Sequence, residues 1–212
     1  MDLNQAIRSY ATQPLTHQLL LSLLKDYKRP NDKVHQLLTN GLLSPVKKGL
    51  YVAGPAIGAG KPEPFLLANH ILGPSYISLD TALSYHGLIP ERVFETASMT
   101  TKASRSFTTA VGLFTYTHLA LPYYTFGIQQ ARLTEEQFVM IASPEKALCD
   151  KIAATAGIIL RSQASAGTYL LEDLRMDEDN LRELNTGLIR NWLPDAPKKD
   201  SLGMMIKMIE SL

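Results

Sequence analysis

The fold of this 212-residue chain is predicted from the stretch Gly41 to Ala53, which reads Gly-Leu-Leu-Ser-Pro-Val-Lys-Lys-Gly-Leu-Tyr-Val-Ala. Two short apolar runs flank the turn Lys47-Lys48-Gly49, a pattern typical of a β-hairpin. The hairpin is expected to carry both lysines at its tip.

A helix is predicted directly before this hairpin, from Pro30 to Asn40. Its apolar side chains recur at the helical spacing i, i+3, i+4 and i+7, and its polar side chains share the opposite face. The apolar positions are Val34, Leu37, Leu38 and Gly41, and the polar positions are Lys33, Gln36 and Asn40. Such a helix followed by a basic hairpin suits duplex DNA, with the helix in the major groove and the hairpin along the phosphates. An ordinary helix and hairpin of an α+β protein is the alternative.

Two further helices are expected before this one, at Leu3 to Tyr10 and Pro14 to Lys25. The second carries a wide apolar face of leucines, and Pro14 suits a first helical turn. Three helices and a hairpin within residues 1–53 predict a winged helix-turn-helix domain. Its expected DNA-contacting side chains are Lys28, Arg29, Asn31, Lys33, Gln36, Lys47 and Lys48.

Charge is distributed unevenly along the chain. The whole chain has a net charge of +1, but residues 1–61 hold eight Lys and Arg against three Asp and Glu. Residues 62–212 hold thirteen against seventeen. A basic N-terminal part favours a polyanionic partner, whereas the acidic remainder argues against coating by nucleic acid along the whole chain. A second, smaller basic spot is expected at Lys102 and Arg105.

Residues 54–64, Gly-Pro-Ala-Ile-Gly-Ala-Gly-Lys-Pro-Glu-Pro, are predicted to be a linker because Gly and Pro interrupt helices and strands. The fragment Gly58 to Lys61 resembles part of a phosphate-binding loop. The full spacing of that motif is missing, and Pro62 follows where free backbone N–H groups are needed. Nucleotide binding is therefore not expected.

Residues 65–212 are predicted to form a mixed domain in which an antiparallel sheet is flanked by helices. The α+β class follows from strand patterns between Val93 and Ile141 and helix patterns on both sides. Ser78 and Ser143 are expected to cap helices, with Pro144 opening the second of these helices. The strands are expected at Val93–Met99, Phe107–Thr109, Leu113–His118, Tyr123–Gln129 and Phe138–Ile141, and later helices at Leu170–Leu174, Asp177–Trp192 and Ser201–Leu212.

No catalytic or metal-binding group is expected in the chain, and no cofactor. The five histidines show no paired ligand spacing, and Glu145 and Asp150 lie five positions apart and do not share a helix face. Cys149 recurs with Ile152, Ala153 and Ala156 at helical spacing, which indicates a core thiol. One cysteine also fits a reducing compartment, and the absence of a leader or long apolar segment predicts a cytoplasmic protein without a membrane partner.

Three blocks of the sequence resemble the AbiEi antitoxin family of abortive-infection toxin–antitoxin pairs. The blocks are Gly41–Val52, Ser75–Leu88 and Ala142–Asp150. The resemblance implies an N-terminal domain that binds double-stranded DNA at its own promoter and represses transcription. It also implies a C-terminal antitoxin domain that opposes a nucleotidyltransferase-like toxin, an opposition that does not require a stable complex between the two proteins. The alternatives are a stand-alone winged-helix regulator, a protein-interaction module without a toxin, and an enzyme whose site the sequence does not reveal.

Overall fold

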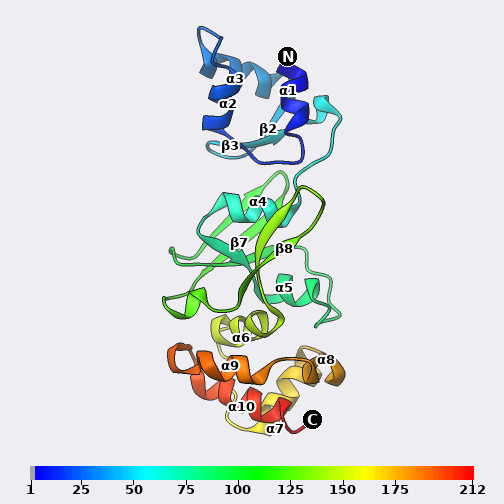
Figure 1. Cartoon of the computed structure of the whole chain (residues 1–212), viewed down its shortest axis with the longest axis vertical. Helices are drawn as coiled ribbons and strands as arrows, with labels where there is room; N and C mark the ends of the chain where they lie inside the picture. The colour runs from blue at the N-terminus through cyan, green and yellow to red at the C-terminus, as the bar shows by residue number, and fades with distance from the viewer. Residues whose placement is uncertain (1–2) are drawn as a thin grey trace.

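The computed structural model describes residues 3–212, which stack in three tiers along one long axis (Figure 1). We call these tiers the N-terminal unit (residues 3–61), the sheet unit (62–142) and the helical unit (143–212). The N-terminal and helical units lie at opposite ends, with the sheet unit between them. The described residues are therefore an α+β structure.

The N-terminal unit contains short helices and a three-stranded antiparallel sheet of order β1-β3-β2. The helix predicted before the hairpin is confirmed, with Pro30 in its first turn, where the missing N–H costs nothing. The hairpin is also confirmed, and Gly49 allows its turn by adopting φ +80°. In chain order the elements are α1 (Leu3–Ser9), β1 (Leu15–Thr16), α2 (His17–Leu23), α3 (Pro30–Thr39), β2 (Leu43–Lys47) and β3 (Leu50–Ala53).

The prediction of one helix from Pro14 to Lys25 was wrong at its beginning. Leu15 and Thr16 instead pair with Tyr51 and Leu50 of β3, and α2 begins only at His17. Thr16 caps that helix, its hydroxyl accepting from the N–H of Leu19 at 3.2 Å. The added strand gives backbone partners to the second edge of β3, which a helix begun at Pro14 would have left open.

The two ends of the β2–β3 hairpin approach each other closely at Gly54. A Cβ atom on Gly54 would lie 2.1 Å from the carbonyl oxygen of Gly41, which belongs to the backbone and has little freedom to move. We expect Gly54→Ala to destabilise the N-terminal unit by about 1–3 kcal/mol through overpacking. Chemical denaturation followed by circular dichroism measures this change.

Gly203→Ala is the matched control, because a Cβ there meets nothing within 4 Å and the residue lies inside a helix. It is expected to leave stability unchanged or to raise it by up to about 1 kcal/mol. Equal loss of stability in both variants would contradict the close approach at Gly54.

One face of the hairpin packs against the sheet unit. Val46, Leu50 and Val52 share a buried cluster with Leu67 and Ile71 of the next helix. The rest of the N-terminal unit has its own small core, built around α1 to α3. The linker predicted at 54–64 thus connects two units that share apolar contacts.

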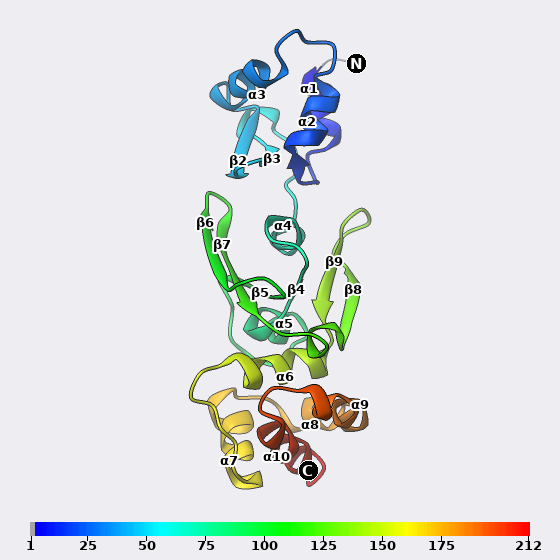
Figure 2. The same ribbon diagram turned by 90° about the vertical axis from the view of Figure 1, so that its left-hand side faces the viewer.

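The sheet unit contains six strands in the order β6-β7-β5-β4-β9-β8. Helix α4 lies over one face of this curved sheet, and α5 lies on the other (Figure 2). The elements are α4 (Pro64–Ile71), β4 (Ser75–Ile77), α5 (Leu79–Tyr85), β5 (Thr96–Thr100), β6 (Arg105–Thr109), β7 (Gly112–His118), β8 (Ile128–Arg132) and β9 (Phe138–Ala142).

The predicted antiparallel arrangement of this sheet was wrong, because the sheet is mixed. Strand β4 is antiparallel to β5 but parallel to β9, and β5 is parallel to β7. Strand β4 is only three residues long, too short to show the alternating pattern from which strands are predicted. Its fully buried side chains place it at the centre of the sheet, where it separates β5 from β9.

One predicted strand, Tyr123–Gln129, also differs from the structure. Its first part is a 3-10 turn at Tyr123–Thr125, and strand β8 begins at Ile128. The turn presents the carbonyl oxygen of Tyr123 to a buried lysine ammonium at 3.0 Å, a contact that the strand pattern did not reveal.

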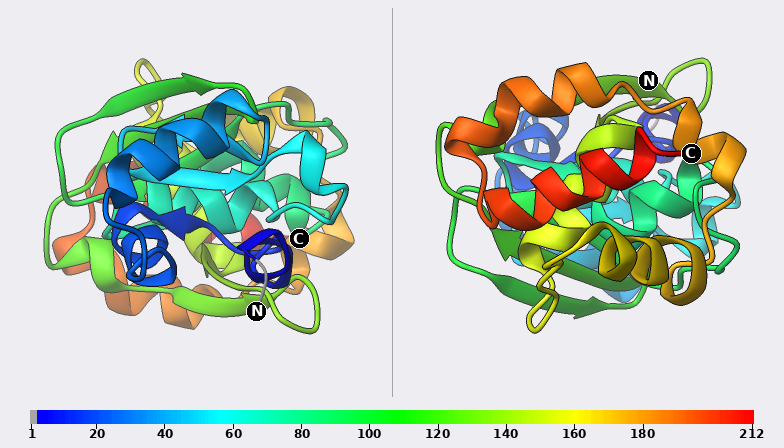
Figure 3. Two further views of the ribbon diagram at one scale, coloured as in Figure 1. Left: turned by 90° about the horizontal axis from the view of Figure 1, so that it is seen from above. Right: turned by 90° about the horizontal axis from the view of Figure 1, so that it is seen from below.

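The helical unit closes the lower end of the molecule (Figure 3, right). As predicted, Ser143 caps its first helix, accepting from the N–H of Lys146 at 3.2 Å, and Pro144 occupies the first turn. The single helix predicted over Asp177–Trp192 is two helices, because Asn185 accepts from the N–H of Leu188 and begins a new one. The elements are α6 (Pro144–Ala154), α7 (Gln163–Gly167), a π-helical turn (Thr168–Asp173), α8 (Glu178–Arg182), α9 (Thr186–Trp192) and α10 (Lys199–Ile209).

None of the helices between residues 3 and 212 combines the length and the apolar character needed to cross a lipid bilayer.

Candidate nucleic-acid interface

Helix α3 exposes the polar face that the sequence predicts. Val34 and Leu37 are buried against α1 and α2, whereas Asn31 and Gln36 are exposed on the outer side. The hydrophobic periodicity thus fixes which side of α3 faces solvent. Amide side chains on such a face have the donor and acceptor pair that reads adenine in a major groove.

The connection between α2 and α3 carries three exposed cations, Lys25, Lys28 and Arg29, and the sequence predicts DNA contacts for the last two. Arg29 lies 3.7 Å from Asp32, and both side chains are largely exposed, at 84% and 71%. An exposed pair of this kind contributes about 0–1 kcal/mol, so the guanidinium can exchange its carboxylate for a phosphate at little cost.

Lys33 is held more firmly than its neighbours. Its ammonium donates to Gln36 Oε1 at 2.9 Å and lies 5.3 Å from the centre of the Tyr27 ring. Lys33 is half-buried by these contacts. The charge of Lys33 therefore stays close to the surface of α3, and the side-chain oxygen of Gln36 already accepts a hydrogen bond from it.

The two lysines of the hairpin do not share one environment. Lys48 is exposed at the turn, as expected of a hairpin tip. Lys47 instead points towards the sheet unit, where its ammonium donates to the carbonyl oxygen of Ile71 at the end of α4. Lys47 is thus placed between the units, a position that the hairpin pattern alone did not indicate.

Lys47 also brings the second basic spot close to the hairpin. Its pKa is lowered, first by burial and then by the nearby charges of Lys102 and Arg105. Lys102 and Arg105 are both exposed, and the Arg105 guanidinium lies 5.4 Å from the centre of the Phe107 ring. Two basic regions that are far apart in sequence are therefore neighbours in the structure.

These basic elements follow one another along one side of the molecule. Figure 2 shows α3, the β2–β3 hairpin and the β6–β7 hairpin in succession down the same side. The predicted residues Lys28, Arg29 and Lys48 thus belong to a surface that continues onto the sheet unit through Lys102 and Arg105.

A polar cluster that was not predicted from the sequence is buried between the sheet and α6. The Lys146 ammonium lies 3.0 Å from Asp150 Oδ1, and both side chains are 0% exposed. Asp150 Oδ2 accepts from Tyr76 at 2.8 Å and from Ser78 at 2.7 Å. Burial raises the pKa of Asp150 and lowers the pKa of Lys146, and the opposite charge of the partner counteracts each of these shifts. No group of this enclosed pair is positioned to meet a solute. The Asp150 carboxylate joins α6 to Tyr76 of β4 and to Ser78, and Lys146 of the same helix balances its charge.

This cluster corrects the role predicted for Ser78. Ser78 stands at the cap position of α5, but its side chain makes no capping bond there and donates to Asp150. The cluster has a signal in the sequence, because Lys146 and Asp150 lie four apart in a helix whose intervening residues are apolar. The sequence-based prediction compared Asp150 with Glu145 instead. Cys149 is buried beside the cluster, as predicted for a core thiol.

Residues 3–212 hold no group of three or more His, Cys, Asp or Glu side chains arranged to bind a metal ion.

Comparison with models of known protein families finds no match to this chain, and comparison with curated proteins finds no significant similarity.

Proposed function

We propose that the protein binds double-stranded DNA through its N-terminal unit and represses its own promoter. The observation that carries this proposal is the surface formed by α3, the exposed cations beside it and Lys48. The order of helices and strands in the unit, with α3 directly before a hairpin, is the order expected of a winged helix-turn-helix. In this arrangement α3 enters the major groove and Lys48 meets a phosphate.

Lys102 and Arg105 extend the proposed footprint onto the sheet unit. Their charges reach Lys47 and lower its pKa, and none of the three forms an ion pair among the described residues, which favours a polyanion nearby. DNA that crosses the hairpin would pass over both units.

The two hairpin lysines are expected to differ in a DNA-binding titration. Lys48→Gln should lower the slope of log affinity against log salt by about 0.9, the value for one lost phosphate contact. Lys47→Gln should change this slope much less, because its ammonium already serves the Ile71 carbonyl. Fluorescence anisotropy of a labelled duplex at several salt concentrations measures both slopes. A larger effect at Lys47 than at Lys48 would mean that Lys47 leaves its internal partner on binding.

We propose further that the sheet and helical units act as an antitoxin against a nucleotidyltransferase-like toxin, by binding and without turnover. The support is the resemblance to AbiEi antitoxins and the way its blocks fold. Block 75–88 forms β4 and α5, and block 142–150 ends β9 and begins α6. These two blocks supply Tyr76, Ser78, Lys146 and Asp150, the members of the buried polar cluster.

A growth assay tests this second role. Where a nucleotidyltransferase-like toxin gene stands beside this gene, cells that express that toxin should survive when the full chain is co-expressed. Survival should persist with Lys28→Glu/Arg29→Glu/Lys48→Glu, because those residues belong to the proposed DNA surface. The full chain is preferred to fragments, since cutting after residue 61 would expose Val46, Leu50 and Val52. Failure of a well-expressed wild-type chain to protect would refute the antitoxin role and leave a stand-alone regulator.

A further inference from the structure

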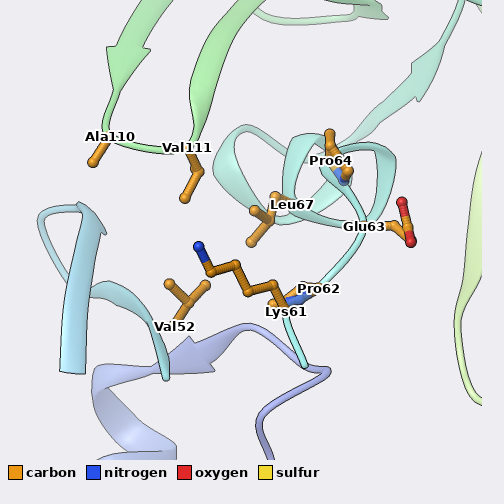
Figure 4. A pocket seen from close by; sticks show the side chains of 8 residues that line it. All are labelled: Val52, Lys61, Pro62, Glu63, Pro64, Leu67, Ala110 and Val111. Carbon is orange, nitrogen blue, oxygen red and sulfur yellow. The ribbon is translucent and has the colours of Figure 1, made fainter. Parts of the chain in front are cut away.

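Lys33 on helix α3 is held by two neighbouring side chains. Its ammonium donates to Gln36 Oε1 at 2.9 Å and lies 5.3 Å from the centre of the Tyr27 ring. Lys61, beside the open cleft at the linker, provides a contrast, because its ammonium extends towards Val111 in a space lined by neither an amide nor an aromatic ring (Figure 4). The position of the Lys33 charge is therefore defined by the protein itself.

Tyr27 lies on the connection between α2 and α3 and is 43% exposed. Its ring lies under the Lys33 ammonium, which is the arrangement of a cation–π contact. Both residues line one open hollow of about 610 Å³ together with Gln36. Asp32 is the acidic residue of that hollow, and its carboxylate lies 3.7 Å from Arg29. Lys33 itself forms no ion pair within residues 3–212, so its charge is held by an amide and a ring alone.

The contact with Lys33 fixes the orientation of the Gln36 amide. An ammonium carries three N–H donors and no acceptor, so it can approach only the oxygen of the amide. The nitrogen of the amide, Gln36 Nε2, then keeps its two N–H groups for another partner. Lys33 and Gln36 thus present hydrogen-bond donors together, while the acceptor of the amide is already engaged.

Two adjacent donors match one base in the major groove. Guanine presents two acceptors there, N7 and O6, whereas adenine presents one acceptor and one donor, thymine one acceptor and cytosine one donor. We infer, building on the proposed binding of DNA by α3, that Lys33 and Gln36 together read a guanine, one donating to N7 and the other to O6. Tyr27 is the positioning residue that holds Lys33 beside Gln36. A glutamine with a free oxygen would match adenine instead.

Guanine recognition is tested with the full chain and a duplex that carries the DNA upstream of this gene, by fluorescence anisotropy. Each guanine in turn is replaced by 7-deazaguanine, which keeps the base pair but has a C–H group in place of N7. At the guanine read by this pair, the replacement should lower the affinity of the wild-type chain about tenfold, because one hydrogen bond to the base is lost. An A·T pair at that position should lower the affinity by about tenfold or more.

Substitutions then identify the side chains that read this guanine. Lys33→Met frees the oxygen of Gln36, so the preference for G·C over A·T at this position should disappear or reverse. Tyr27→Leu should weaken the preference, and Tyr27→Phe should retain it because the aromatic ring remains. Lys28→Met is the matched control, since it removes an exposed cation from the same hollow. It should lower the affinities for both duplexes by the same factor, because a phosphate contact carries no base information.

Three results would each overturn guanine recognition by this pair. The first is that no 7-deazaguanine weakens binding, the second is that Lys33→Met keeps the preference for G·C, and the third is that Lys28→Met changes that preference as much as Lys33→Met does. All three are compatible with tighter binding of the upstream duplex than of a scrambled one, so the proposed promoter binding survives them. Equal affinity of the wild-type chain for the upstream and scrambled duplexes would instead refute the promoter binding, and guanine recognition with it.

Discussion

Reversing three charges on the N-terminal unit, with Lys28→Glu, Arg29→Glu and Lys48→Glu together, is expected to lower the affinity for duplex DNA by about 100-fold or more near physiological salt. Each of the three side chains is exposed, and none is tied into the core. Each is expected to neutralise one phosphate, so their reversal replaces attraction by repulsion. The slope of log affinity against log salt should fall by about 2.7, since each lost contact contributes about 0.9.

A control variant with the same change in net charge at a distant site shows whether net charge alone explains this result. Lys198, Lys199 and Lys207 lie in or beside α10, at the far end of the molecule from α3 (Figure 1). Lys198 is left unchanged, because its ammonium donates to two carbonyl oxygens. The control variant therefore carries Lys199→Glu and Lys207→Glu. It is compared with a variant of equal charge change on the N-terminal unit, Arg29→Glu and Lys48→Glu. The α10 pair should alter DNA affinity only through long-range charge, by a small factor. A comparable loss from both pairs would show that the affinity follows net charge instead of the proposed surface.

The second large effect is expected at the buried pair Lys146–Asp150. Asp150→Asn leaves an ammonium without a counter-charge in a site that is closed to solvent, and Lys146→Met leaves a carboxylate there. Breaking a buried ion pair by removing one partner costs about 3–5 kcal/mol. Each single variant is therefore expected to lose that much free energy of unfolding, or to fail to fold.

The double variant Lys146→Met/Asp150→Asn is expected to lose less free energy of unfolding than the sum of the losses in the two single variants. It removes both charges, while the amide oxygen introduced at position 150 would still accept from Tyr76 and Ser78. A coupling energy of about 1–3 kcal/mol is expected from the double-mutant cycle, measured by chemical denaturation. Additive losses would show that Lys146 and Asp150 contribute independently and that the two charges are not coupled.

The sequence predicted the local elements of the N-terminal unit well because their signals are local. The spacing of Val34 and Leu37 defines the inner face of α3, and Gly49 defines the hairpin turn. Strand β1 was missed because two residues show no periodicity, and their strand conformation depends on an edge of β3 that is distant in sequence. Nothing in residues 41–53 alone indicates that Lys47 turns towards Ile71.

The sheet was less predictable, for a topological reason. Strand residues were recognised from Thr, Tyr and Phe content, but their order depends on β4, which is three residues long. A strand so short has no periodic pattern, yet it provides the parallel pairing with β9. The other parallel pairing, of β5 with β7, arises because β6 lies at the edge of the sheet instead of between them. The buried cluster depends on the placement of β4, since Tyr76 and Ser78 meet Asp150 only when β4 lies beside α6.

The candidate site was predictable residue by residue, but its extent was not. Lys28, Arg29 and Lys48 are exposed where the sequence expects them, whereas the proximity of Lys102 and Arg105 to Lys47 arises from the packing of the hairpin on α4.

DNA recognition by the N-terminal unit is tested most directly by the affinity of the full chain for two duplexes of equal length, measured by anisotropy at several salt concentrations. One duplex carries the DNA upstream of this gene, and the other carries the same bases in scrambled order. The upstream duplex is expected to bind about a thousandfold more tightly or better, and the triple variant Lys28→Glu/Arg29→Glu/Lys48→Glu is expected to bind both duplexes more weakly. Equal affinity for the two duplexes, or undiminished binding by the triple variant, would contradict DNA recognition by the N-terminal unit.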